Sequence, residues 1–199
     1  SFFYPEYFRG RRRYDEWGTE LSWRIATDIG APLTAEVRRR LGLPRLGSRG
    51  VCRAADRHPI LMATDPALVP PAADWERRGR RVVQTGYLAP PPESVEPGPE
   101  LAAFLERRPV YVGFGSFTTF ATRADLDLVV EAAGRAGVPV LTPAGGPVAP
   151  GPVGEDVLAG GPLPHSWLFG RVAATIHHAG SGTAHEALRS GRPSLGVPF

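Results

Sequence analysis

The sequence predicts an α/β protein in which a parallel sheet carries helices on both faces. Three observations lead to this prediction. From residue 109 onward, short apolar runs alternate with amphipathic segments, and the connections between them are short. One of these runs leads through a glycine-containing turn into a helical segment. A proline-rich stretch separates this regular part from a less regular one before it. Such alternation is typical of parallel sheets.

The first part, residues 1–88, contains two expected helices and two expected strands. Apolar residues near a 3.6-residue period predict a helix over about residues 14–29, which Gly30 ends. A second helix is expected from residue 33 or 34 to 41, with Thr34 as N-cap and Gly42 at the C-cap. Residues 60–63 and 81–85 are expected to form short strands.

The second part begins after a linker and a short helix, residues 89–108. Three consecutive prolines lack N–H donors and fix φ, so the linker should be extended and semi-rigid. Strands and helices then alternate through residues 109–199. We expect strands at residues 110–114, 138–141, 156–158, 173–176 and 194–197, and helices at residues 100–107, 123–135, 166–171 and 183–190. A Gly/Pro-rich loop is expected between residue 141 and residue 154.

Composition excludes several classes of protein. All 23 basic residues are arginine, so a Walker-type phosphate loop, a lysine Schiff base and a Ser-Lys dyad are excluded. Cys52 is the single cysteine, which excludes an internal disulfide and permits a reducing, cytoplasmic location. The net charge of +3 is low for a nucleic-acid-binding protein. No run of about 18 apolar residues offers a membrane span.

The most informative stretch is the turn between the strand at residues 173–176 and the following helix. Ligands of parallel sheets bind at the carboxyl ends of strands, and a helix N-terminus there attracts a phosphate. Gly180 and Gly182 allow close backbone approach, while His178 and Thr183 can donate to phosphate oxygens. Thr183 can also cap the helix. Glu186, one turn into the helix, can accept from ribose hydroxyls.

This stretch resembles the signature of family 1 glycosyltransferases of the GT-B fold. Plant members carry His-Cys-Gly-Trp-Asn-Ser-x-x-Glu, which matches His178 to Glu186. Bacterial antibiotic (macrolide, glycopeptide) glycosyltransferases and sterol glucosyltransferase-like proteins carry His-His-Gly-Gly/Ser-x-Gly-Thr, then Glu-Ala-Leu, Gly-x-Pro and a strand ending in Val-Pro-Phe. The corresponding residues here run from His177 to Phe199. Ala179 replaces the family's usual Gly or Cys. Residues 66–75, 110–116 and 164–169 extend the resemblance.

The resemblance implies a GT-B protein made of the end of an N-terminal Rossmann-like domain and most of a C-terminal one. Residues 1–88 would then be the C-terminal part of an acceptor-binding domain, and residues 109–199 a truncated nucleotide-sugar donor domain. Glu186 would bind the ribose, and His165 and Trp167 would form the base pocket. The donor diphosphate would contact Ser116, His178, Gly180, Ser181, Gly182 and Thr183.

The resemblance also implies a chemistry. The sugar of a UDP- or TDP-sugar would move, with inversion and without a metal ion or other cofactor, to a hydroxyl of a lipophilic small molecule, lipid or sterol. The family's catalytic base and the Asp-Gln pair that holds the sugar fall on no residue of this chain. We therefore expect a fragment that binds nucleotide without turnover. Peripheral membrane contact is possible for such a protein, and no nucleic-acid partner is expected.

Other interpretations of these residues remain open. The turn could be purely structural. It could also be a dinucleotide fingerprint, although Gly180-x-Gly182-x-x-His185 lacks the third glycine. A zinc site is disfavoured because neighbouring strand residues point to opposite faces; His177 should accordingly point into the sheet. The arginine-rich run at residues 9–13 is expected to be a solvated loop, with an anionic membrane or nucleic acid as the alternative.

Each site residue likewise has a structural alternative. Ser116 could cap a turn, and Glu186 could be an acid that the helix dipole favours. His165 and Trp167 could be a helix start and a core anchor. Two functional alternatives to a transferase also remain: a non-catalytic nucleotide-sugar-binding module and a sugar-nucleotide epimerase of the same fold.

Overall fold

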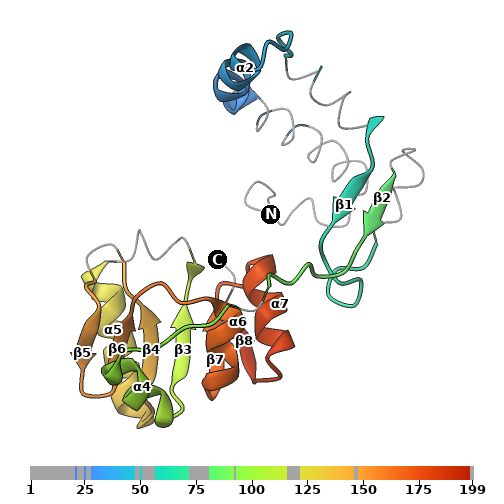
Figure 1. Cartoon of the computed structure of the whole chain (residues 1–199). Coiled ribbons are helices and arrows are strands. Elements are labelled where there is room, and N and C mark those ends of the chain that lie inside the picture. Colours follow the sequence, from blue (N-terminus) through green and yellow to red (C-terminus); the bar gives the residue numbers. More distant parts are fainter. Residues whose placement is uncertain are drawn as a thin grey trace. The chain divides into compact units, whose positions relative to one another are not determined.

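The computed structural model describes residues 21, 25, 28–47, 50, 57–71, 81–91, 93–115, 122–145 and 148–197. The chain divides into two compact units, Ser1–Gly86 and Tyr87–Phe199, and each is described by itself (Figure 1). The helix expected over residues 14–29 lies mostly outside the described residues, although residues 21, 25, 28 and 29 are helical. The arginine-rich run at residues 9–13 lies outside them entirely.

In the first unit, helix α2 spans Ala31–Arg40. Its N-cap is Gly30, so the prediction of Thr34 as N-cap is wrong. A proline in the first turn is pre-organised for a helix and lets α2 begin earlier. The Thr34 hydroxyl instead donates back to the Gly30 carbonyl at 2.9 Å. The C-cap is Leu41, one residue before the predicted Gly42, which follows it with the left-handed φ of +66°.

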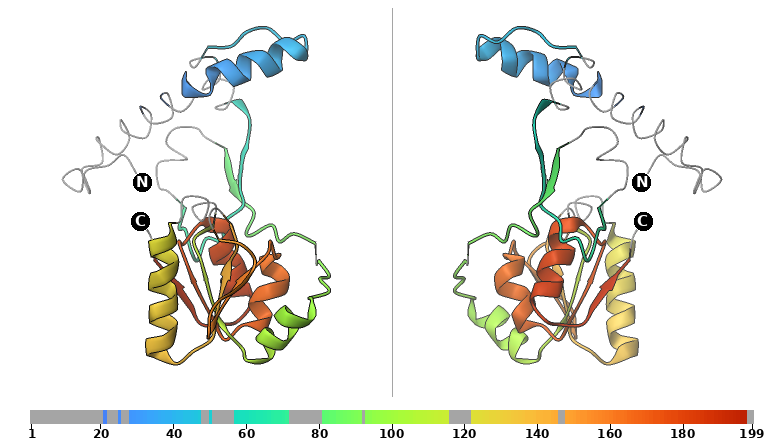
Figure 2. Two further views of the ribbon diagram at one scale, coloured as in Figure 1. Left: turned by 90° about the vertical axis from the view of Figure 1, so that its left-hand side faces the viewer. Right: turned by 90° about the vertical axis from the view of Figure 1, so that its right-hand side faces the viewer.

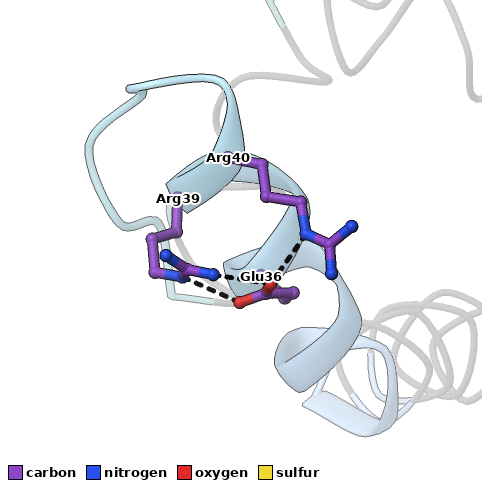
Figure 3. A network of polar contacts seen from close by, with 3 residues as sticks. All are labelled: Glu36, Arg39 and Arg40. Carbon is purple, nitrogen blue, oxygen red and sulfur yellow. Dashed lines mark hydrogen bonds and ion pairs between the residues drawn. The ribbon is translucent and has the colours of Figure 1, made fainter.

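An exposed ion-pair network lies on α2 (Figure 3). The Glu36 carboxylate accepts from Arg39 Nε and Nη2 and from Arg40 Nε, each at 2.8 Å. Arg39 and then Arg40 hold the pKa of Glu36 below its ordinary value. Exposed pairs of this kind contribute little to stability. The two expected strands of this unit form a parallel pair, β1 at Ile60–Met62 and β2 at Val82–Gln84.

The second unit is built on a six-stranded sheet with the order β5-β6-β4-β3-β7-β8. All neighbouring strands are parallel except the pair β5 and β6. The strands are β3 (Val110–Gly113), β4 (Val140–Pro143), β5 (Gly151–Gly154), β6 (Val157–Gly160), β7 (Ala174–His177) and β8 (Ser194–Gly196). The sequence analysis placed β5 in a loop. It is an antiparallel edge strand, where glycine and Pro152 are tolerated and the apolar pattern is lost.

Helices cover both faces of this sheet, as Figure 2 shows. One face packs against α4 (Pro99–Glu106), α6 (His165–Leu168), the 3₁₀ helix η3 (Phe169–Arg171) and α7 (Ser181–Arg189). Phe169, Leu168 and Leu141 are the largest fully buried side chains of that core. On the other face α5 (Arg123–Ala136) packs on Val140 and Val157 through Ala133.

Helix α5 shows how local sequence defines an element. The Thr122 hydroxyl accepts from the Asp125 N–H, and the Asp125 carboxylate accepts from the Thr122 N–H. This reciprocal capping box satisfies two N–H groups at the helix start. Gly137 ends the helix with φ +63°. Among the described residues, no helix is long and apolar enough to span a membrane.

Candidate functional site

The strand order places the candidate site at one edge of the sheet. The chain starts at the central strand β3, adds β4 and β6 on one side, and then crosses to β7 and β8 on the other. The order therefore reverses between β3 and β7, where Gly113 is paired with His177. Ligands in open α/β sheets bind at such a switch point, outside the carboxyl ends of the strands. The predicted glycine turn after β7 and the segment with Gly115 after β3 both begin there.

His178 lies in the turn between β7 and α7, and two glycines make room for its ring. A Cβ atom on Gly115, which follows β3, would come 2.5 Å from His178 Cε1. A Cβ atom on Gly180 would overlap Nε2 and lie 3.0 Å from Cε1. Gly115 also has φ +62°, a conformation that favours glycine. The sequence analysis assigned Gly180 to ligand approach; the structure adds that its missing side chain accommodates His178.

The turn continues directly into α7. The N-cap is Gly180, so Thr183 is the third residue of the helix and the prediction that it caps α7 is wrong. Gly180 has the extended φ and ψ that an N-cap needs, and therefore the helix begins two residues earlier than predicted. No described side chain caps α7. Its first N–H groups, at Ser181, Gly182 and Thr183, therefore remain available to an anion beside His178.

His177 is a structural residue. Its side chain is 3% exposed, as expected for a residue that points into the sheet. Nδ1 accepts from the Ala179 N–H at 3.1 Å, so the neutral ring carries its proton on Nε2. Nε2 then donates to Ser194 Oγ at 2.8 Å, which ties β7 to β8. Burial, and next the neighbouring His178, lower the pKa of His177.

Glu186 is a buried carboxylate on α7. It is 5% exposed, and its Oε2 accepts from Arg189 Nε at 3.3 Å. Among the described residues, Oε1 has no hydrogen-bond partner. The Tyr87 ring stacks on His185 at 4.8 Å. Burial, and next the Glu186 carboxylate, raise the pKa of Tyr87. A buried carboxylate with an unpaired oxygen is suited to accept from ligand hydroxyls.

A pocket of about 440 Å³ opens at the carboxyl ends of β3, β4 and β6. Gly115, Thr142 and His165 are among its lining residues. Trp167 lies elsewhere: it is 7% exposed in the core, with the Arg171 guanidinium 4.3 Å from its ring. The structure thus brings His165 to the pocket and favours the core-anchor interpretation for Trp167.

Ser116 lies outside the described residues, so its predicted place beside the diphosphate stays a prediction. Tyr111 is a pocket residue that the sequence analysis missed. In the sequence, Tyr111 looks like one more apolar residue of a buried strand. The available signal was Gly113, two residues later on the same face of β3, where a Cβ atom would lie 2.6 Å from Tyr111 Cζ. Among the described residues, no cluster of three or more His, Cys, Asp or Glu side chains could hold a metal ion.

Known glycosyltransferases are similar to this chain in sequence. No family model matches the chain. It is 40% identical over 145 residues to the vancomycin aglycone glucosyltransferase of Amycolatopsis orientalis, covering 71% of this chain and 33% of that protein. It is 33% identical over 191 residues to the O-mycaminosyltylonolide 6-deoxyallosyltransferase of Streptomyces fradiae, covering 94% and 42%. It is 31% identical over 176 residues to the sterol 3-beta-glucosyltransferase of Kluyveromyces lactis, covering 80% and 14%.

Solved structures give the same picture of the fold. The glycosyltransferase SnogD from Streptomyces nogalater matches with a TM-score of 0.51 and 25% identity, covering 75% of this chain and 44% of that one. The Arabidopsis thaliana UGT89C1 complex with UDP-L-rhamnose matches with a TM-score of 0.54 and 21% identity, covering 77% and 40%.

The architecture is therefore that of a GT-B glycosyltransferase. Within this class, the chain belongs to the family 1 glycosyltransferases that include the antibiotic and sterol enzymes. It spans less than half the length of the three relatives described above.

Proposed function

We propose that the second unit binds the nucleoside diphosphate of a UDP- or TDP-sugar, as the donor domain of a glycosyltransferase. The diphosphate lies against the N-terminus of α7 and His178, the ribose hydroxyls donate to Glu186, and the base enters the pocket beside His165. Ser116 completes the diphosphate site in this proposal. The observation that carries it is the position of His178, held between Gly115 and Gly180 next to the first N–H groups of α7, which no described side chain caps.

Electrostatics supports an anionic ligand at this place. The first turn of α7 contains no acidic residue, and its N-terminus carries a partial positive charge. Glu186 is further along the helix, where a buried Oε1 without a hydrogen-bond partner among the described residues suits a hydroxyl and not a phosphate. The UGT89C1 structure that shares this fold was solved with UDP-L-rhamnose. The cytoplasmic location, which a lone cysteine permits, belongs to the same proposal.

The reaction that we propose is a single displacement with inversion. A general base takes the proton of the acceptor hydroxyl, and the oxygen attacks the anomeric carbon. The bond from that carbon to the diphosphate oxygen breaks, and its electron pair leaves with the nucleoside diphosphate. His178 and the α7 N–H groups stabilise the departing charge, as fixed donors do in many enzymes, and a metal ion is not needed.

The acceptor is proposed from the relatives. Their names specify a vancomycin aglycone, O-mycaminosyltylonolide and sterols. We therefore propose a lipophilic small molecule or a sterol-like lipid as the acceptor class.

Isothermal titration of the chain with UDP and TDP tests the proposal. We expect saturable binding of at least one of them, and weaker binding after His178→Ala. Gly134→Ala is the matched control, because a Cβ atom on Gly134 of α5 would meet no heavy atom within 4 Å. Unchanged affinity in the His178 variant would contradict the site assignment. Release of UDP from UDP-sugar only when an acceptor alcohol is present would separate a transferase from an epimerase. Binding without any release would favour the non-catalytic module.

A further inference from the structure

The Tyr111–His165 pair forms one wall of the 440 Å³ pocket. Tyr111 lies on the central strand β3 and is 5% exposed. Its ring extends over Gly113, where no side chain could be accommodated. The hydroxyl lies 3.3 Å from His165 Nε2. The central strand of the sheet is therefore connected directly to the first residue of α6.

The proton in this contact belongs to Tyr111. Burial raises the pKa of Tyr111 to about 12, so the phenol stays protonated. Among the described residues, His165 Nε2 is the hydrogen-bond partner of this hydroxyl. A buried donor without an acceptor is costly, so the phenol donates and Nε2 accepts. Burial lowers the pKa of His165. The Glu186 carboxylate opposes this shift, and His177 and His178 add to it, so the ring stays neutral.

A neutral imidazole that accepts at Nε2 carries its proton on Nδ1. Neighbouring rings hold this imidazole in place. Phe169 stacks on it at 4.5 Å with an interplanar angle of 15°, and Tyr111 meets it edge-on at 5.7 Å. Apart from the Tyr111 contact at Nε2, the described residues make no side-chain hydrogen bond with the His165 ring. The ring thus offers a fixed N–H donor in the wall of a pocket that we assign to the base.

We propose that Tyr111 sets the tautomer of His165, and that His165 Nδ1–H selects a base with a carbonyl oxygen at position 4. Uracil and thymine present an acceptor there, whereas cytosine presents an amino donor that would face the Nδ1 donor. Tyr111 is a positioning residue, and His165 is the residue that determines specificity. This inference rests on the proposed nucleotide binding, and it adds a side-chain basis for the preference for uracil or thymine over cytosine.

Titration of the chain with UDP and CDP tests the selection. We expect wild type to bind UDP at least 10-fold more tightly than CDP. Tyr111→Phe keeps the ring and removes the phenol, so this preference should fall to about 2-fold. In His165→Asn the side-chain amide nitrogen can replace Nδ1 and should retain the preference, whereas His165→Phe should lose it. Val157→Ala is the control for general destabilisation, because Val157 packs on the opposite face of the sheet.

Nitrogen NMR of the histidine rings tests the tautomer without any ligand. We expect His165 to be protonated at Nδ1 in wild type and to shift toward the Nε2 tautomer in Tyr111→Phe. Protonation at Nε2 in wild type, or equal affinity for UDP and CDP, would overturn the inference. If no nucleotide binds, the proposed function fails and base selection with it. If UDP binds but both tautomer and preference are unchanged in Tyr111→Phe, the inference alone fails.

Discussion

Gly180→Ala is the substitution that most directly tests the arrangement around His178. The new Cβ atom would overlap His178 Nε2 and lie 3.0 Å from Cε1. The backbone of Gly180, with φ −59° and ψ 141°, accepts alanine without strain. The clash is with the end of a side chain, so the imidazole can swing away. We therefore expect the protein to fold with His178 displaced from its place beside α7.

The expected loss of UDP affinity follows from the hydrogen bond that a displaced His178 can no longer donate to the diphosphate. A hydrogen bond to a charged group contributes about 1.5–3 kcal/mol. Each 1.4 kcal/mol is a factor of ten in affinity, so UDP should bind about 10- to 150-fold more weakly. The stability cost should be about 1 kcal/mol or less, because alanine is a poorer N-cap than glycine. Isothermal titration gives the affinity, and urea unfolding gives the stability.

A double-mutant cycle with His178→Ala shows whether the effect passes through the imidazole. If it does, Gly180→Ala should weaken binding little further once His178 is absent. Gly134→Ala in α5 should bind UDP like wild type and be more stable by about 0.5–1 kcal/mol. Wild-type affinity in Gly180→Ala, or additive losses in the double variant, would refute the reasoning.

Three further predictions concern stability, each measured by urea unfolding. Ala179 has φ +60°, so Ala179→Gly should gain up to about 1 kcal/mol, and a loss would show that the conformation is not strained. Thr122→Ala removes half of the α5 capping box and should cost about 1 kcal/mol; no change would mean that water caps the helix equally well. The pKa of His177 is lowered from about 6.5, so the contribution of its neutral ring to the free energy of unfolding is complete above pH 6.5. This contribution is lost as the pH falls through the lowered folded-state pKa. Between pH 7 and pH 5, wild type should lose more stability than His177→Gln, which keeps a donor for Ser194; parallel curves would contradict this.

Local sequence was sufficient for most elements of the second unit. Alternating apolar runs predicted five of its strands. In β4 and β6, which are largely buried, the run is continuous because a parallel strand covered on both faces needs apolar residues. Helix starts were predicted correctly where a side chain caps the helix, as Thr122 does for α5. The starts at Gly30 and Gly180 were missed, because a glycine N-cap leaves no side-chain signal. Strand β5 was missed because an edge strand needs no apolar pattern.

The sequence by itself determined the local pattern of the candidate site: a glycine turn, a histidine and an acid at fixed spacing after a strand. Those spacings are local, and local backbone geometry converts them into a turn and a helix. The tertiary structure decided which residues meet. It brought Gly115 against His178 and Tyr111 against His165, which are 63 and 54 positions apart in the chain. It also moved Trp167 into the core. Contacts between strands that are distant in sequence depend on the order of strands in the sheet, and no local pattern encodes that order.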